Sequence, residues 1–275
     1  MPAPPASFPA LAALLALLLA SASGTDVHDI GEAQFTYEGP QGPSHWGDLS
    51  PKFAACARGQ HQSPVNIVRN ATVANKNLKA LTRDYRPANA TLVNNGFNIG
   101  VVYEEEVGML LVDGKNYSFK QMHWHSPSEH HIDGIQFPAE LHLVHKASDG
   151  NFAVVAILYR LGDPDPLISK IKGQLDQLAK EACGADEEAH IPLGIFNPKQ
   201  IKRNTRKYYR YVGSLTTPPC TENVTWNVLG KVRSISKEQV ASLKAPLAAD
   251  DKTNFRPLQP LNGRQVQLYD ELGNQ

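Results

Sequence analysis

The stretch YSFKQMHWH, residues 117–125, alternates side chains in the way that is typical of a β-strand. Because the side chains of a strand point alternately to its two faces, Gln121, His123 and His125 share one face, and the apolar residues between them share the other. The stretch therefore predicts a strand that carries two imidazoles on one side and core side chains on the opposite side.

AELHLVH, residues 139–145, follows the same alternation and places Glu140 and His142 on one face. If this strand lies beside the first, His142 completes a triangle with His123 and His125. Three neutral imidazoles leave one position of a tetrahedral Zn²⁺ open, which is typical of a catalytic zinc site rather than a structural one. The two strands therefore predict a candidate zinc centre.

Histidines are also ordinary polar residues of strands, and three others nearby are interpreted as surface or core histidines: His130, His131 and His145. The ligand interpretation is favoured by residues that could hold the second ring nitrogen of each ligand. Gln121 shares a face with His123, and Glu140 shares a face with His142.

Further runs have the character of strands, and brief connectors with Gly, Asp or Asn separate them: 90–95, 98–104, 108–114 and 151–161. Brief connectors favour antiparallel neighbours. Only residues 165–183 show a clear helical period, and a second, short helix is expected at 236–243. We therefore predict one mainly β domain, a β-rich α+β fold built on a large twisted, mostly antiparallel sheet with a few peripheral helices.

The chain has 275 residues, and its 27 basic and 27 acidic residues balance, so charge gives no footprint for nucleic acid or an anionic membrane. The apolar run at 11–20, followed by small residues, is typical of a secretory signal peptide over about residues 1–24. No later run is long enough for a transmembrane helix. We expect a released domain at 25–275 without a membrane span.

Four Asn-x-Ser/Thr sequons agree with this route and are candidate glycosylation sites: Asn70, Asn89, Asn116 and Asn223. Asn223 falls in a strand-like run, where a glycan would fit poorly. The three cysteines, Cys56, Cys183 and Cys220, imply one disulfide and one leftover thiol. Spacing does not choose the pair, although loop-like surroundings favour Cys56 with Cys220.

These motifs resemble those of the α-class carbonic anhydrases, and the SPSEH form is similar to that of the plant members. The resemblance rests on QMHWHSPSEH, AELHLVH and YYRYVGSLTTPPCTENVTWNVL, with GPSHWGDLSP, QHQSPVNI and RPLQPLNGR elsewhere, and spans about residues 35–270. It implies one Zn²⁺ per chain at the base of a conical cavity. It also implies reversible hydration of carbon dioxide to bicarbonate and a proton by attack of zinc-bound hydroxide.

The zinc ligands implied by the resemblance are His123, His125 and His142, and their hydrogen-bonding partners are Gln121 and Glu140. Thr216 would accept a hydrogen bond from the hydroxide and donate its own proton to Glu129, which orients the attacking oxygen. Thr217 would meet the substrate or bicarbonate. The resemblance further implies an apolar wall for carbon dioxide at Val144, Val154, Leu215, Val224 and Trp226.

The resemblance also implies a disulfide between Cys56 and Cys220, with no counterpart for the third cysteine. In the fastest relatives a histidine that carries protons to solvent follows the Asn-Gly turn, but this chain has Phe97 there. Because phenylalanine cannot carry a proton, we expect slower, buffer-dependent turnover, with water chains held by Tyr37 and Asn95.

Other functions compete with this interpretation. Dioscorin-like storage or binding proteins keep the fold but lose a zinc ligand or most activity. This chain retains His142, where such chains can have Gln, which favours the enzyme. A side esterase activity is expected from the same metal, with inhibition by sulfonamides and small anions. The expected location is extracellular or, by the same secretory route, the plastid.

Overall fold

The structure is a computed structural model that describes residues 34–181, 189–201 and 206–272. These residues belong to one compact unit, Ala33–Gln275. The predicted signal peptide and Cys183 lie outside the described residues.

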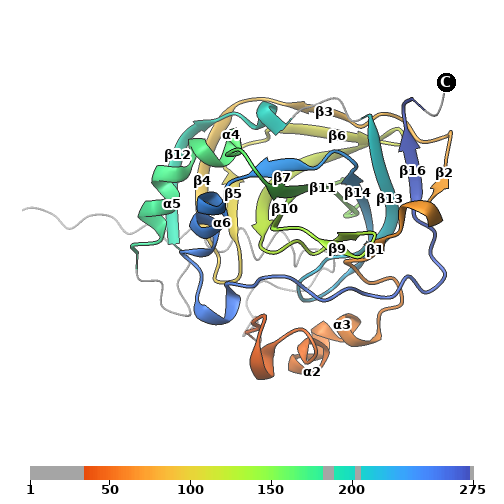
Figure 1. The fold of residues 1–275 in the computed structure, drawn as a ribbon, viewed down its shortest axis with the longest axis horizontal. Coiled ribbons are helices and arrows are strands. Elements are labelled where there is room, and N and C mark those ends of the chain that lie inside the picture. Colours follow the sequence, from red (N-terminus) through yellow and green to blue (C-terminus); the bar gives the residue numbers. More distant parts are fainter. Residues whose placement is uncertain (1–33, 182–188, 202–205, 273–275) are drawn as a thin grey trace, which may run out of the picture. The chain divides into compact units, whose positions relative to one another are not determined.

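A sheet of 13 strands dominates the fold (Figure 1). Its main path is β12 (Ala189–Phe196), β4 (Ala88–Asn94), β5 (Ile99–Tyr103), β7 (Lys115–His125), β10 (Ala139–Lys146), β11 (Phe152–Leu161), β14 (Glu222–Leu229), β13 (Lys207–Ser214), β16 (Gln267–Asp270) and β2 (Val73–Ala74). Three further strands belong to the sheet but lie outside this path: β6 (Gly108–Val112), β3 (Thr82–Tyr85) and β15 (Arg233–Ile235). A small second sheet contains β1 (Asn66–Ile67), β8 (His131–Ile132) and β9 (Ile135–Gln136).

The predicted strands are all present, and the mainly β fold is confirmed. β4, β5, β7, β10 and β11 are each antiparallel to the next, as their brief connectors indicated. The sheet is nevertheless mixed, because β11 pairs in parallel with β14 and β15, and β16 pairs in parallel with β2. The long connection from β11 to β14, which contains helices and other strands, makes that parallel pairing geometrically feasible.

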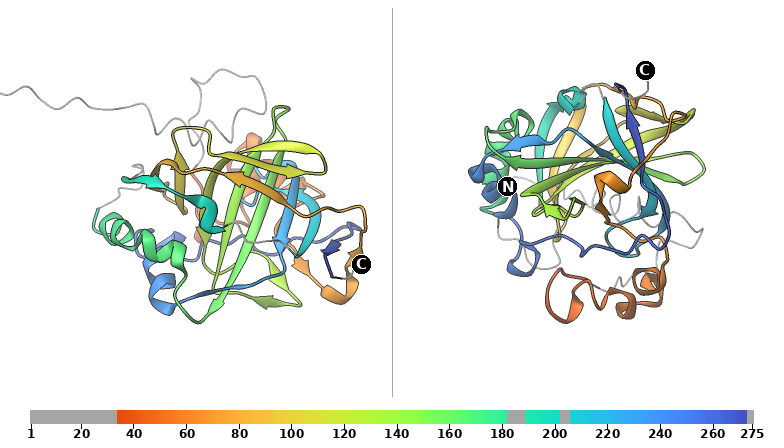
Figure 2. Two further views of the ribbon diagram at one scale, coloured as in Figure 1. Left: turned by 90° about the horizontal axis from the view of Figure 1, so that it is seen from above. Right: turned by 45° about the vertical axis from the view of Figure 1, so that its right-hand side comes forward.

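The helices are short and peripheral: α2 (Trp46–Leu49), α3 (Ala55–Arg58), α4 (Pro166–Lys170), α5 (Lys172–Leu178) and α6 (Lys237–Lys244). The described residues also contain five 3₁₀ turns: η1 (Gly39–Gln41), η2 (Pro51–Phe53), η3 (Arg69–Ala71), η4 (Pro198–Ile201) and η5 (Ala249–Asp251). α4, α5 and α6 gather beside β4 and β12, whereas α2 and α3 form a separate group (Figure 1, Figure 2). No helix within the described ranges has both the length and the apolar character needed to cross a membrane.

The expectation of one helix over 165–183 is wrong, because two helices share the described part of that range. Asp165 caps α4 by accepting from the amides of Leu167 and Ile168. The Ile171 amide then bonds to the Ile168 carbonyl, and this i→i+3 contact ends α4 before α5 begins. The break lets apolar residues of both segments pack in the main core. The second helix is confirmed, and Ser236 caps α6 with a capping box.

Candidate metal centre

The three predicted ligand histidines meet in the middle of the sheet. His142 of β10 pairs directly with His123 of β7, and His125 pairs with Glu140 two residues along the ladder. The ring centroids are 5.0 Å apart for His123 and His125, 5.2 Å for His123 and His142, and 4.7 Å for His125 and His142. One ring nitrogen from each lies within 4.8 Å of the other two, so together these residues could hold a metal ion.

The outer ring nitrogen of each of these histidines is held by an oxygen atom. His123 Nδ1 lies 2.8 Å from Gln121 Oε1, and His142 Nε2 lies 2.8 Å from Glu140 Oε1, as the strand alternation indicated. His125 Nδ1 lies 2.6 Å from the carbonyl oxygen of Asn254. These contacts direct the remaining nitrogens, His123 Nε2, His125 Nε2 and His142 Nδ1, toward a common point.

The inner nitrogens have the character that a metal requires. His125 Nε2 is buried and has no hydrogen-bond partner among the described residues. Burial lowers the pKa of His123 and His142 and lowers the pKa of His125 to about 4. The rings are therefore neutral at ordinary pH, which is the form that donates a lone pair to Zn²⁺. Burying a nitrogen lone pair without a partner costs free energy unless a ligand satisfies it. The three histidines therefore fit a bound metal.

A second cluster of possible ligands, which contains His130, Glu140 and His142, has a different explanation. Glu140 Oε1 lies 2.7 Å from His130 Nδ1 and 2.8 Å from His142 Nε2, so these atoms already satisfy one another. Burial raises the pKa of Glu140, but the two histidines outweigh it and hold that pKa well below its usual range. His130 also contacts the Tyr211 hydroxyl at 2.7 Å, and it is a buried core histidine.

Glu129 and Thr216 lie beside the three histidines. Glu129 Oε2 is 3.5 Å from His125 Nε2 and 3.9 Å from His142 Nδ1. Burial raises the pKa of Glu129 to about 7, although the neighbouring His142, a hydrogen bond with Thr216 and the Arg256 amide act in the lowering direction. Thr216 is buried, and Thr217 is partly exposed. The predicted partners Glu129 and Thr216 are therefore brought together.

The predicted apolar wall is a row of residues across neighbouring strands. Val144 of β10 pairs with Val154 of β11, and Val154 pairs with Trp226 of β14. Val224 and Leu215 are also buried. The Trp226 ring lies 4.8 Å from the His142 ring, which puts this end of the row beside the metal centre.

The predicted disulfide between Cys56 and Cys220 is confirmed. It attaches the end of the loop that carries Thr216 and Thr217 to the segment containing α3. Within the loop, the Cys220 amide donates to the Thr217 carbonyl oxygen at 2.8 Å. The position of the two threonines thus depends on a covalent link between distant parts of the chain.

The residues expected to hold water chains are not hydrogen-bonded to the histidines in the described part of the chain. The Tyr37 hydroxyl is buried without a partner there, and the Asn95 side chain accepts from the Asn98 amide at 3.0 Å. Phe97 does occupy the expected turn. The centre of its ring lies 4.8 Å from the centre of the Phe35 ring. The turn therefore presents an aromatic surface at the position where a proton-carrying histidine would be needed.

The family model for eukaryotic-type carbonic anhydrase matches residues 41–270. The chain belongs to that family. Alpha carbonic anhydrase 7 of Arabidopsis thaliana is 41% identical over 93% of this chain and 91% of its own length.

Solved structures of carbonic anhydrase relatives share the fold. A crystal structure of dioscorin complexed with ascorbate has a TM-score of 0.82 and 37% identity, and it covers 86% of this chain and 98% of its own. An α-carbonic anhydrase from Thermovibrio ammonificans in complex with the inhibitor sulfanilamide has a TM-score of 0.76 and 36% identity. It covers 86% of this chain and 100% of its own.

Two residues of this carbonic anhydrase domain were missed by the sequence interpretation. Asn254 holds His125 through its carbonyl oxygen, and its side chain bonds to the Ser126 amide and the Phe97 carbonyl oxygen. Arg256 donates its amide to Glu129 Oε1 at 3.0 Å. Both act largely through main-chain atoms from about 130 residues away, and such contacts leave no residue-type signal in a single sequence.

Proposed function

We propose that this chain is a zinc enzyme that reversibly hydrates carbon dioxide to bicarbonate and a proton. The observation that carries the proposal is the convergence of three neutral imidazoles whose outer nitrogens are each held by an oxygen atom. The buried His125 Nε2, which has no partner in the part of the chain that the structure describes, adds to it. His123, His125 and His142 would hold the ion. Zinc bound there would supply a nucleophile at neutral pH, because it lowers the pKa of a bound water to roughly 7.

Thr216 and Glu129 would orient that nucleophile. The Thr216 hydroxyl has a single proton, which it donates to the Glu129 carboxylate when that group is ionised. The hydroxyl oxygen can then only accept from the nucleophile, so one lone pair of the nucleophile is left to attack carbon. Arg256 supports this arrangement, because its amide donates to Glu129 Oε1 and so holds the carboxylate in place.

The apolar row is suited to carbon dioxide, which has no charge and no strong hydrogen-bonding group. Val144, Val154 and Trp226 are buried beside His142, and Leu215 and Val224 would extend this surface. Thr217, which is partly exposed next to Thr216, would meet the substrate or bicarbonate. Side hydrolysis of esters at the same metal, and inhibition by small anions and by sulfonamides such as the one bound to the bacterial relative, belong to the same proposal.

Proton transfer to solvent would be the slow part of turnover. Phe97 and Phe35 form an aromatic contact in the turn where a histidine carrier would lie, and neither ring can take up a proton. Water chains near Tyr37 and Asn95 would then have to carry the proton, or a soluble buffer would replace them.

We further propose that the chain is made through the secretory route and delivered outside the cell or to the plastid. The Cys56–Cys220 disulfide supports an oxidising compartment. The asparagines of the four sequons are all exposed: Asn70, Asn89, Asn116 and Asn223. A glycan could therefore be attached at each of them.

A second candidate function is that of a storage or binding protein with little activity, which the similarity to dioscorin favours. Fold alone does not choose between the two. The complete set of three histidines, including His142, favours the enzyme.

The deciding experiment is to measure the zinc content and the carbon dioxide hydration rate of purified protein, before and after metal removal with a chelator and again after zinc is restored. We expect one zinc per chain, loss of hydration in the stripped protein, its recovery with zinc, and stimulation of the native protein by imidazole. Protein that binds no zinc and stays inactive after zinc is added would overturn the proposal and favour the storage function.

A further inference from the structure

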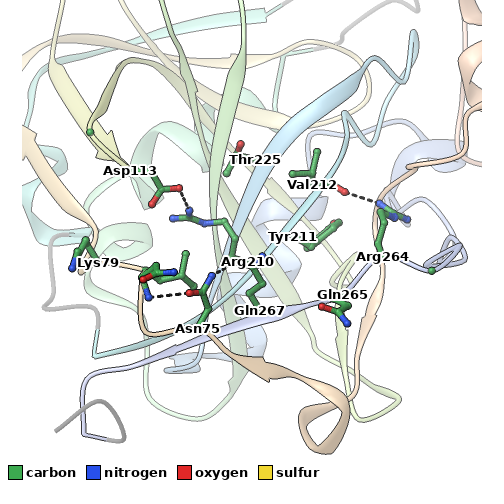
Figure 3. A pocket seen from close by; sticks show the side chains of 14 residues that line it. Asn75, Lys79, Asp113, Arg210, Tyr211, Val212, Thr225, Arg264, Gln265 and Gln267 are labelled. Carbon is green, nitrogen blue, oxygen red and sulfur yellow. Dashed lines mark hydrogen bonds and ion pairs between the residues drawn. The ribbon is translucent and has the colours of Figure 1, made fainter.

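A hollow of about 960 Å³ lies on β13 and β14, with rims from the segment after β2, the β6–β7 turn and the segment before β16 (Figure 3). Arg210, Val212 and Thr225 line it from the opposite side of the sheet from the metal centre, whereas Tyr211 borders it from the near side. Tyr211 of β13 reaches His130 and so faces the centre, whereas its neighbours Arg210 and Val212 point to the other face. The hollow is thus separate from the proposed active site.

An arginine held rigidly by its neighbours forms part of this hollow. Arg210 Nε donates to Asn227 Oδ1 at 2.7 Å, and Nη2 donates to the Tyr208 hydroxyl at 3.2 Å. The Arg210 side chain is only 7% exposed, yet its charge partner, Asp113, is 54% exposed. Asp113 sits at the tip of the β6–β7 turn. The guanidinium is therefore preorganised, while the carboxylate that covers it is open to solvent on one side.

The other charges of the hollow are positive. Arg264 donates to main-chain carbonyl oxygens of β13 and of neighbouring loops, and none of these acceptors neutralises its charge. Lys79 is exposed and forms no ion pair with the described residues. Three cationic side chains thus line the hollow against the single carboxylate of Asp113. In a chain with no net charge, such a local excess attracts anions.

The remaining lining suits the body of a small organic molecule. Gln265 and Gln267 supply amide groups, Thr225 supplies a hydroxyl, and Val212 is 48% exposed and supplies an apolar surface. The volume falls in the range of pockets that take small molecules, about 300–1,000 Å³. A hollow with these groups is too small and too weakly charged to be the footprint of a nucleic acid.

We propose that this hollow binds a small hydroxyl-bearing organic oxyanion, either a carboxylate or a phosphate ester. Arg210 and Lys79 receive the oxyanion, and the amides and Thr225 receive the hydroxyl groups. Asp113 competes with the ligand for Arg210 and has to move away when the ligand binds. This inference does not depend on zinc or on carbon dioxide hydration.

Calorimetric titration of the full mature protein tests the proposal with three matched probes: glucose 6-phosphate, glucuronate and glucose. We expect at least one of the two anions to bind and neutral glucose not to bind, and the preferred anion distinguishes phosphate from carboxylate recognition. Absence of binding by both anions, or equal binding of glucose, would overturn the proposal.

Charge variants then locate the binding. Lys79→Glu should weaken binding of the anion by at least about tenfold. The control is Lys237→Glu, which changes an exposed lysine on α6 and should leave the affinity unchanged. Asp113→Asn should instead tighten binding, because it removes the competing charge from Arg210 and keeps a residue that tolerates the positive φ of 49°. Binding that Lys79→Glu leaves unchanged lies elsewhere, the metal centre included, and would overturn the proposal, as would weaker binding in Asp113→Asn.

Discussion

The two faces of β7 and β10 both bury histidines, but they use the rings differently. On one face, His123, His125 and His142 each have one nitrogen held by the protein and one directed at the other two rings. On the opposite face, His145 has both nitrogens occupied, by the Tyr85 hydroxyl at 2.6 Å and by the Ala153 carbonyl oxygen at 3.2 Å.

This difference separates a candidate ligand from a core residue. Burial lowers the pKa of His145 to about 3, just as it lowers the pKa of the other three, so neither burial nor neutrality identifies a metal site. A metal site is identified instead by whether the second ring nitrogen is left without a protein partner and points at the other rings. The same criterion excludes His130, whose two nitrogens contact Glu140 and Tyr211.

The largest contrast should come from the same substitution on the two faces of β10. His142→Gln should abolish zinc binding and lower hydration by more than about 1,000-fold, because the ion loses a ligand. His145→Gln should keep zinc and activity but lose about 2–4 kcal/mol of unfolding free energy, because a buried contact is broken. Zinc analysis, hydration assays and denaturant unfolding check both; a zinc-free His145→Gln protein that remains folded would contradict the distinction.

Thr216→Ala tests whether the centre does more than hold a metal. We expect hydration to fall about 100-fold, since the attacking oxygen is no longer oriented. Zinc content should stay at one per chain, because Thr216 is not among the three ligands. Loss of metal in this variant would show that its role is structural.

The hydrogen bond behind His123 should have a smaller effect. Gln121→Ala is expected to weaken zinc binding by about 10–100-fold, because the ring loses the group that orients it. Lys120→Ala, the neighbouring position on β7, is the matched control and should leave affinity unchanged. Competition with a chromogenic chelator measures both, and equal affinities would refute the orienting role.

The pH dependence of stability should include a contribution from His145. In the unfolded chain this residue takes up a proton below about pH 6.5, whereas in the folded chain it stays neutral until about pH 3. Its contribution is therefore fully present above pH 6.5 and is lost as the pH falls, by up to about 1.4 kcal/mol per pH unit. Unfolding at several pH values should show a shallower acid dependence in His145→Gln than in the native chain; identical slopes would contradict this assignment.

The smallest expected effect is a gain. Phe97→His places a group with a pKa near neutrality in the turn beside Phe35, so turnover in weak buffer should rise several-fold. The stimulation by imidazole should shrink in parallel. An unchanged rate would indicate that proton transfer does not limit turnover.

Much of the fold followed from local patterns. Strand alternation placed Gln121 and Glu140 behind their histidines, because a period of two fixes which residues share a face. The break of the helix at Ile171 was not predictable, since it depends on how two segments pack on one core. The roles assigned to Thr216 and Glu129 came from family resemblance, and no periodicity would have joined residues so far apart in the chain.

The bridge between Cys56 and Cys220 has a consequence for how the molecule would respond to a protease. Its two cysteines are 164 positions apart in the sequence, so it makes a covalent ring that contains His123, His125 and His142. A single cut inside this ring releases no fragment. Asn254 and Arg256 lie outside this ring. After one cut shortly beyond Cys220, only noncovalent contacts would hold Asn254 against His125 and Arg256 against Glu129.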